Sequence, residues 1–318
     1  MRKRSWGLVA LVIAVGAALL AVTLSGSHGH GATSRALPTR PIYGVTIDNV
    51  ANMSKVLSSV QAMPYMPTTR VYFDVTEPAS YYTSPLKKLY PRSYIMGEAL
   101  DSSEMTSVTL SGEKTRVASL LSTLGPNVDI WEVGNEVNGN WTGPYTTGSQ
   151  LVVNTYDQVV AAGAKTALTL YENSWCPDHC GDGPAELTPV QYSQQYVPAS
   201  VRNGLNYVLL SWFPTQAGNL TNPNVPVSTV TAEVQALHAL YPNAMIGFGE
   251  LGLPNKTRLT TQAKAQSIMA YYYGLAVAEP YYIGGYFWWY WYEDLSLAGM
   301  QTSLNSAFRS EATALGAG

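Results

Sequence analysis

Eight short runs of β-branched and apolar residues recur along the chain, and their repetition constrains the fold more than any other feature. The starts of successive runs lie 23 to 40 residues apart. Strands that alternate with helices build βαβ units and a parallel sheet. We predict strands over residues 42–47, 69–75, 92–97, 128–133, 166–171, 206–212, 244–249 and 283–289.

Longer stretches with apolar residues at helical spacing separate most of these runs, and several stop at proline or glycine. The pattern is weakest over 77–91, between the second and third runs. We predict helices over residues 52–63, 116–124, 150–162, 227–240, 260–278 and 302–315.

Eight such units in one chain predict a closed (β/α)₈ TIM barrel, which typically takes about 250 residues. Several runs, such as 207–210, are apolar on both faces, as buried parallel strands are. The alternative is an open, doubly wound sheet. That fold would normally carry a glycine-rich phosphate loop after the first strand, and the segment 44–50 has none.

The composition excludes one class of partner and leaves another open. Of the 318 residues 46% are hydrophobic, enough to fill a large core, while only 12% are charged and the formal net charge is −3. No long basic run occurs after residue 4, so we expect no nucleic-acid partner. The 22 tyrosines and 8 tryptophans combine an apolar face with a hydrogen-bonding edge, which suits sugar binding and buried cores alike.

The N-terminus has the pattern of an export signal. Arg2, Lys3 and Arg4 precede an uncharged run over 6–24, and a small polar stretch follows. The run is long enough to cross a bilayer, so an uncleaved signal anchor is the alternative to a cleaved signal. We therefore predict a signal peptide or signal anchor plus linker over 1–38 and a barrel domain over 39–318. The protein would be secreted, or tethered to the outer face of the membrane by residues 6–24.

The two cysteines suit an oxidising compartment. Cys176 and Cys180 could close a small disulfide loop. A metal site that also used His179 is the alternative, but a structural site normally needs four ligands and the chain has no second cysteine pair. We expect no metal, no organic cofactor and a monomer.

Two glutamates end strands in apolar surroundings. Glu136 follows the fourth predicted strand, and Glu250 follows the seventh. Barrel enzymes carry their active sites at the C-terminal ends of the strands, so both side chains would face one mouth. A carboxylate there is costly to desolvate unless it is used or paired. Two facing carboxylates are what the cleavage of a glycosidic bond requires.

The pair Asn135-Glu136 after strand four and Glu250 after strand seven resembles the clan A glycoside hydrolases, of which family 5 is the best-known branch. The resemblance covers residues 42–300 in strand order. It implies that Glu136 is the general acid/base, that Asn135 binds the sugar 2-hydroxyl and that Glu250 is the nucleophile of a retaining mechanism. The two carboxyl groups would then lie about 5–5.5 Å apart.

The resemblance also gives Arg70, on the second strand, a role beside the nucleophile. Its charge would keep Glu250 ionised by lowering the pKa of that carboxyl. The alternative is a structural ion pair lower in the barrel.

Aromatic residues are the candidates for sugar contacts. The resemblance implies an aromatic floor on strand eight, where period-two alternation puts Phe287, Trp289 and Trp291 on one face. We predict that Trp289 and Trp291 face the cleft. Further candidates, each of which could equally pack in the core or support other side chains, are Tyr171, Trp212, Trp141, Trp175, Asp48 and Glu98.

The chain departs from the clan after strand six. Many clan members have a histidine or tyrosine there that hydrogen-bonds the nucleophile, whereas this sequence has Ser211 followed by Trp212. The partner of Glu250 is therefore not identified by the sequence. We predict a retaining glycoside hydrolase acting on β-linked poly- or oligosaccharides, with a non-catalytic carbohydrate-binding barrel as the alternative. Glucanase, mannanase and exo-acting specificities stay open.

Overall fold

A computed structural model describes residues 35–37, 39–175, 186–214, 224–253 and 262–317 of the chain. The predicted export segment over 6–24 and the cysteine pair Cys176 and Cys180 lie outside these ranges. Within them, no helix combines the length and hydrophobicity that crossing a membrane would require.

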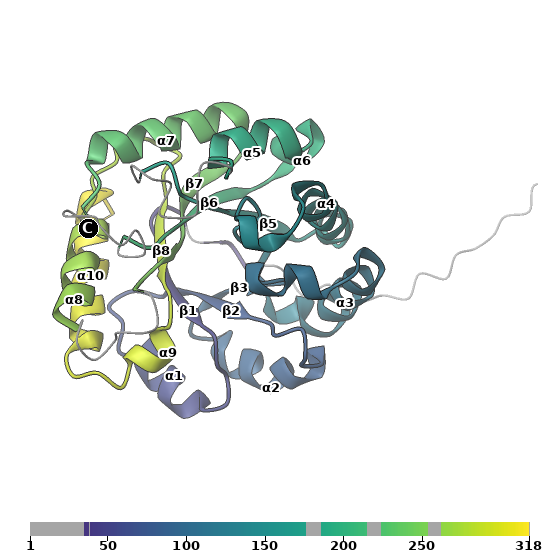
Figure 1. The fold of residues 1–318 in the computed structure, drawn as a ribbon. Coiled ribbons are helices and arrows are strands. Elements are labelled where there is room, and N and C mark those ends of the chain that lie inside the picture. Colours follow the sequence, from purple (N-terminus) through teal and green to yellow (C-terminus); the bar gives the residue numbers. More distant parts are fainter. Residues whose placement is uncertain (1–34, 38, 176–185, 215–223, 254–261, 318) are drawn as a thin grey trace, which may run out of the picture. The chain divides into compact units, whose positions relative to one another are not determined.

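Eight parallel strands close into a barrel in chain order, which confirms the predicted (β/α)₈ fold (Figure 1). Each strand overlaps its predicted run. The strands are β1 (Ile42–Ile47), β2 (Thr68–Tyr72), β3 (Tyr94–Glu98), β4 (Ile130–Glu132), β5 (Lys165–Tyr171), β6 (Tyr207–Trp212), β7 (Met245–Leu251) and β8 (Gly284–Trp288).

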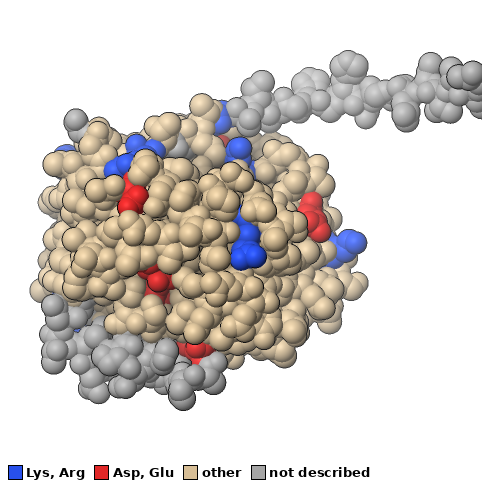
Figure 2. Space-filling view, turned by 90° about the horizontal axis from the view of Figure 1, so that it is seen from above, with Lys and Arg blue, Asp and Glu red and all other residues tan. Residues whose placement is uncertain are grey.

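Helices surround the strands (Figure 1). They are α1 (Met53–Gln61), α2 (Ala79–Leu89), α3 (Leu110–Leu124), α4 (Tyr145–Ala161), α5 (Pro189–Tyr196), α6 (Ala199–Gly204), α7 (Val227–Leu240), α8 (Gln262–Tyr272), α9 (Trp291–Asp294) and α10 (Met300–Ala314), with short 3₁₀ segments η1 (Ser102–Ser107), η2 (Gly125–Asn127) and η3 (Asn140–Thr142). Charged side chains are sparse on the face shown in Figure 2, as the low charge content predicts.

Four of the described helices were not predicted: α2, α5, α6 and α9. The weakly patterned stretch 77–91 forms α2, although Pro85 lies inside it, because its apolar residues still bury one face. Both α5 and α6 lie between β5 and β6. The start of α5 carries a recognisable signal, since Thr188 at the N-cap and Gln191 in the first turn form a reciprocal capping box on either side of Pro189.

The described part of the predicted linker is bound to the barrel. Arg35 forms an ion pair of 2.6 Å with Asp129, which precedes β4, and its guanidinium lies over the ring of Tyr90. Residues 35–37 therefore contact the N-terminal end of the barrel.

The inside of the barrel is apolar at one end and polar at the other. The apolar part is filled by Ile42, Met96, Ile130, Ala167, Tyr207, Leu209, Ile283 and Phe287. Toward the C-terminal ends of the strands, alternation brings buried polar residues to the inside: Thr46, Arg70, Glu98, Glu132, Thr169 and Ser211. The apolar layer thus closes the barrel below a polar mouth.

A β-bulge at Gly249 turns Glu250 into this mouth. Along β6 and β7, Leu210 pairs with Phe248, but the next residue, Ser211, pairs with Glu250. Phe248 packs in the outer core, so strict alternation would send Glu250 outward as well. The extra residue in β7 reverses the direction of the side chain that follows it.

We expect Gly249→Ala to lower both stability and any activity of this mouth. A Cβ at 249 would lie 2.6 Å from Thr169 Oγ1 and 2.9 Å from Leu209 Cβ. Such overpacking costs about 1–3 kcal/mol and would shift Glu250 with the strand. Urea unfolding measures the cost. Gly125→Ala is the control, because a Cβ there meets nothing within 4 Å. Equal stability of the two variants would contradict the expectation.

Candidate active site

Glu136 and Glu250 meet at the mouth of the barrel. Both are buried, with 8% and 3% of their surface exposed. The Ser211 hydroxyl lies 2.5 Å from Glu136 Oε1 and 3.4 Å from Glu250 Oε2. The fold thus brings the two glutamates, 114 positions apart in the sequence, within reach of a single hydroxyl group.

Arg70 lies directly beneath Glu250 and is fully buried. Its Nη1 is 2.8 Å from Glu250 Oε1, its Nε is 2.6 Å from Glu132 Oε2 and its Nη2 is 2.9 Å from Glu98 Oε1. Glu132 also accepts a hydrogen bond from Thr169. Arg70 therefore both contacts Glu250, as the resemblance implies, and forms ion pairs deeper in the barrel, so the two alternatives for this residue coexist.

Asn135 and the loop after β3 complete the surroundings of the glutamates. The Asn135 amide donates to Glu250 Oε1 at 3.1 Å and to Asp101 Oδ2 at 3.3 Å. The Ser102 hydroxyl donates to Glu136 Oε2 at 2.9 Å. Glu136 itself has a φ of 46°, a left-handed conformation that is uncommon outside glycine and often found at functional sites.

Burial dominates the protonation of this cluster. It raises the pKa of Glu136 to about 7 and raises the pKa of Glu250 and of Glu98 well above the usual range. The predicted lowering of the Glu250 pKa is therefore wrong in its net direction. Arg70 does act in the lowering direction, but its charge is divided among three carboxylates and burial outweighs it.

The hydrogen-bond partners indicate where a proton would reside. Arg70 and Asn135 present only N–H donors to Glu250, so they favour its ionised form. Glu136 is bonded to two hydroxyl groups, those of Ser102 and Ser211, and a hydroxyl can accept as well as donate. These partners act against the burial that raises the pKa of Glu250, and they support the ionised form more at Glu250 than at Glu136.

Three of the predicted aromatic residues lie toward the mouth. Trp289 is partly exposed, and its ring centroid is 5.4 Å from the Arg70 guanidinium carbon. Tyr171 shares the inward side of β5 with Thr169. Trp141, partly exposed in η3, packs edge-on against Tyr171 with 5.0 Å between the ring centroids.

The prediction that Trp291 and Trp212 contact a sugar is corrected, because both are fully buried among the helices. Trp291 donates to Ser59 of α1 at 3.0 Å, and Trp212 donates to Tyr272 of α8 at 2.7 Å. The period-two extrapolation failed because β8 ends at Trp288 and Trp291 begins α9.

Alternation explains the orientation of Trp212, and packing corrects one further prediction, that for Trp175. Trp212 faces outward because its neighbour in β6, Ser211, faces the mouth. Trp175, a further candidate for a sugar contact, packs against Trp212 with 5.1 Å between the ring centroids, which makes it part of the outer core instead.

Several residues around the glutamates were missed or only suspected in the sequence. Glu98 was a strand-end candidate without a role, and Ser211 was noted only as a departure from the clan pattern. The alternation of β4 from the inward Ile130 could have indicated Glu132. Nothing in the sequence pointed to Asp101 or Ser102, which lie in the loop after β3.

We expect Trp289→Ala and Trp291→Ala to have opposite effects. Trp289→Ala should raise KM for a sugar substrate and change stability little, because the ring is partly exposed at the mouth. Trp291→Ala should cost about 3–5 kcal/mol of stability by leaving a cavity between the barrel and α1. Urea unfolding and steady-state kinetics separate the two. A larger kinetic effect for Trp291 would contradict this division.

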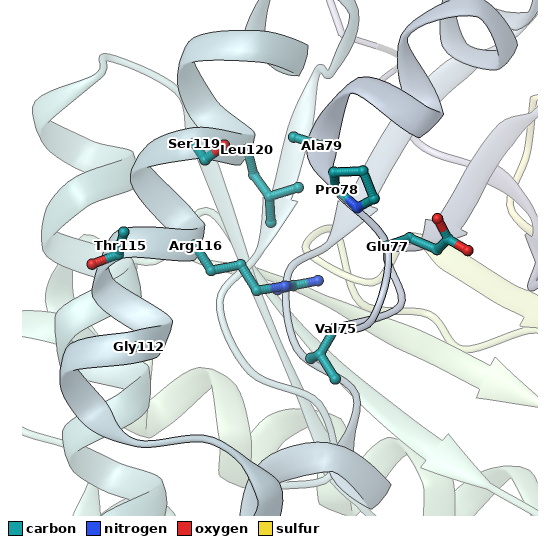
Figure 3. A pocket seen from close by; sticks show the side chains of 9 residues that line it. All are labelled: Val75, Glu77, Pro78, Ala79, Gly112, Thr115, Arg116, Ser119 and Leu120. Atoms are coloured by element: carbon teal, nitrogen blue, oxygen red, sulfur yellow. The ribbon is translucent and has the colours of Figure 1, made fainter.

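A surface pocket of about 300 Å³ lies elsewhere, between α2 and α3 (Figure 3). Arg116 crosses it and donates to the carbonyl groups of Phe73 and Ala99. This guanidinium therefore supports the ends of β2 and β3 from outside. Among the residues that the structure describes, no cluster of metal-ligating side chains occurs.

No family model matches the chain, and no curated protein sequence matches it. Its fold is similar to that of several solved glycoside hydrolases. A GH10 xylanase from Bispora sp. MEY-1 in complex with xylobiose has a TM-score of 0.57 at 13% identity, covering 82% of this chain and 88% of the xylanase. GH5_18 from Streptomyces cattleya in complex with GlcNAc has a TM-score of 0.58 at 15% identity, covering 87% of this chain and 80% of that protein.

A third solved structure agrees with these two. The β-glucosidase from Thermotoga maritima in complex with noeuromycin has a TM-score of 0.50 at 10% identity, covering 80% of this chain and 89% of that enzyme. Identities this low establish the shared fold and nothing finer. The chain therefore has the barrel architecture of these glycoside hydrolases, with two facing glutamates at its mouth.

Proposed function

We propose that the protein is a retaining glycoside hydrolase in which Glu136 is the general acid/base and Glu250 the nucleophile. The observation that carries the proposal is the Ser211 hydroxyl within hydrogen-bonding distance of both carboxylates, at 2.5 Å and 3.4 Å. The nearest carboxylate oxygens can be no farther apart than these two distances combined. This close approach supports the retaining geometry, in which the two carboxyl groups lie about 5–5.5 Å apart, over the inverting geometry, in which they leave room for a water molecule between them.

The reaction would proceed in two displacements. Glu250 attacks the anomeric carbon while Glu136 donates its proton to the departing glycosidic oxygen, and a glycosyl ester forms on Glu250. Glu136 then takes a proton from water, which attacks the anomeric carbon and frees Glu250. Asn135, whose amide reaches Glu250, would bind the sugar 2-hydroxyl, and Trp289 would lie against the ring of the sugar.

The similar solved structures support a carbohydrate as the substrate. The related structures hold xylobiose, GlcNAc and noeuromycin, so we propose a β-linked poly- or oligosaccharide as substrate. The enzyme would meet it outside the cell, as a monomer that is secreted or tethered by residues 6–24. A non-catalytic carbohydrate-binding barrel would have no use for two desolvated carboxylates that face each other.

Covalent labelling tests the proposal. Purified protein is incubated with a panel of 2-deoxy-2-fluoro-β-glycosides that carry a dinitrophenyl leaving group, and the intact mass and peptides are analysed. We expect a glycosyl adduct on Glu250 and a product of retained configuration by NMR. An adduct on a different residue, inversion at the anomeric carbon, or glycan binding without turnover across the panel would contradict the assignment.

The pH dependence should reflect Glu136. Its pKa is raised to about 7 by burial, and it must hold a proton to assist the leaving group. We therefore expect kcat/KM for a phenyl β-glycoside to fall as the pH rises through about 7. A 2,4-dinitrophenyl glycoside is the control, because its leaving group needs no acid and should lose this fall. An identical fall for both substrates would contradict the role of Glu136.

A further inference from the structure

We infer that Ser211 is a positioning residue whose hydroxyl group switches its hydrogen bond between Glu250 and Glu136 as the reaction passes from its first step to its second. This inference rests on the proposed function and adds to it a residue that has no counterpart in the clan pattern of histidine or tyrosine after strand six. It would explain how the chain manages the protonation of its glutamates without either residue.

The position of Ser211 is built into the barrel. Its side chain is fully buried, and the register of β6 and β7 pairs it directly with Glu250 after the bulge at Gly249. Its Oγ lies 2.5 Å from Glu136 Oε1 and 3.4 Å from Glu250 Oε2. Of the hydrogen bonds that the structure describes, those of Ser211 are the ones that reach both glutamates.

The chemistry of a hydroxyl group makes this position a switch. It has one hydrogen and two lone pairs, so it can donate to one carboxylate at a time while it accepts from a protonated one. With the proton on Glu136, the chain of bonds runs from Glu136 O–H to Ser211 and from Ser211 O–H to ionised Glu250. With both groups ionised, Ser211 can satisfy only one of them.

The charged groups around the pair cannot take over this role. Arg70 from β2 contacts Glu250 but is not bonded to Glu136, and Glu98 from β3 and Glu132 from β4 are held by Arg70. Asp101, in the loop after β3, is bonded to Asn135. These groups set the electrostatic background, while Ser211 joins the two reacting carboxylates.

The proton and the bonds balance in each step. In the first, Glu136 gives its proton to the leaving oxygen, the bond from the anomeric carbon to that oxygen breaks and the bond to Glu250 forms. The Ser211 hydrogen then turns from the new ester toward ionised Glu136. In the second, water gives its proton to Glu136 and its oxygen to the anomeric carbon, and the Ser211 hydrogen turns back to the released Glu250 carboxylate.

Ser102 provides a matched control in the same chain. Its hydroxyl donates to Glu136 Oε2 at 2.9 Å. It is buried like Ser211, and no described hydrogen bond joins it to Glu250. Removing Ser102 should therefore affect Glu136 alone, whereas removing Ser211 should affect both glutamates.

The experiment compares profiles of kcat/KM against pH for the wild type, Ser211→Ala, Ser102→Ala and Ser211→Thr. The substrate is a phenyl β-glycoside that the wild type hydrolyses. We expect Ser211→Ala to lower the maximum on the order of ten- to a hundredfold, as for a hydrogen bond to a charged group. Its profile should also narrow from both sides, because the singly protonated pair loses two hydrogen bonds, one of them to a charged carboxylate. The doubly ionised pair loses only one hydrogen bond, and the doubly protonated pair loses only the weaker hydrogen bonds between neutral groups. Ser102→Ala should move only the alkaline limb.

The width of the profile decides the inference. A Ser211→Ala profile that is lower but equally wide, or a Ser211→Thr profile that narrows although the hydroxyl is retained, would overturn it. Thermal unfolding shows whether Ser211→Ala folds. If it does not, Ser211→Thr still tests the switch, because this variant keeps the hydroxyl group. If the wild type is active and is labelled on Glu250, but the Ser211→Ala profile is as wide as that of the wild type, this inference alone is wrong. If the wild type is neither labelled by a glycoside nor hydrolyses one, both the proposed function and this inference are wrong.

Discussion

Glu250→Ala is expected to lower kcat by at least about 10⁴-fold while the barrel stays folded. A methyl group cannot form the glycosyl ester, so the first displacement loses its nucleophile. The fold should tolerate the change, because Arg70 keeps its ion pairs with Glu98 and Glu132 and the mouth loses a carboxylate whose pKa burial raises. Single-turnover kinetics and thermal unfolding measure both effects.

Added azide should separate the roles of the two glutamates. In Glu250→Ala, azide can enter from the side of the missing nucleophile and should give an α-glycosyl azide. In Glu136→Ala, azide replaces the water of the second step and should give a β-glycosyl azide. NMR of the product distinguishes the two. The same anomer from both variants would contradict the assignment of roles.

Glu113→Ala is the matched control for Glu250→Ala. Glu113 is fully buried in α3, and burial raises its pKa to about 7 as well. It lies in α3, outside the barrel mouth, and its ionic partner is Arg116 at 3.7 Å. We expect its removal to leave kcat unchanged. A comparable loss of activity would mean that removing a buried glutamate lowers kcat wherever it lies, so that the effect of Glu250→Ala would not be specific to the mouth.

Arg70→Ala should destabilise the protein by about 3–5 kcal/mol at neutral pH, the cost typical of breaking a buried ion pair by removing one partner. The substitution leaves Glu98, Glu132 and Glu250 close together without the guanidinium that contacts all three. Urea unfolding of the wild type and the variant measures the difference in the free energy of unfolding.

The stability that Arg70→Ala loses should be larger at high pH than at low pH. Without Arg70, which acts to lower them, the folded-state pKa values of Glu98 and Glu250 rise further above the unfolded value of about 4.3. A carboxyl group whose pKa is higher in the folded than in the unfolded state lowers the free energy of unfolding as the pH rises from its unfolded-state pKa through its folded-state pKa. The variant should therefore be closer to the wild type at pH 5 than at pH 8. An equal difference at both pH values would contradict the buried-charge explanation.

Arg70→Lys is a useful intermediate. It retains the positive charge but not the planar fork that reaches three carboxylates at once. We expect it to recover part of the stability lost in Arg70→Ala and to keep a weaker dependence on pH.

Much of the fold could be predicted because its signals are local. Each strand is a short apolar run, and most helices have apolar residues at helical spacing and a proline or glycine at their ends. Chain order then brings the ends of strands four and seven to one mouth, which is why Glu136 and Glu250 could be paired. The missed helices differ in kind, since α5 had a readable capping box and α2 contains an internal proline.

The direction of individual side chains required the tertiary structure. Trp291 does not lie on the predicted face, because β8 ends before it and Trp291 begins α9. Glu250 faces the mouth because β7 has one extra residue relative to β6. The sequence by itself determined the barrel, the order of its strands and the identity of the two glutamates, since these depend on local pattern and spacing. Only the tertiary structure decided that Arg70 contacts three carboxylates and that the Ser211 hydroxyl lies between Glu136 and Glu250. These contacts depend on the register between neighbouring strands, which local pattern does not encode.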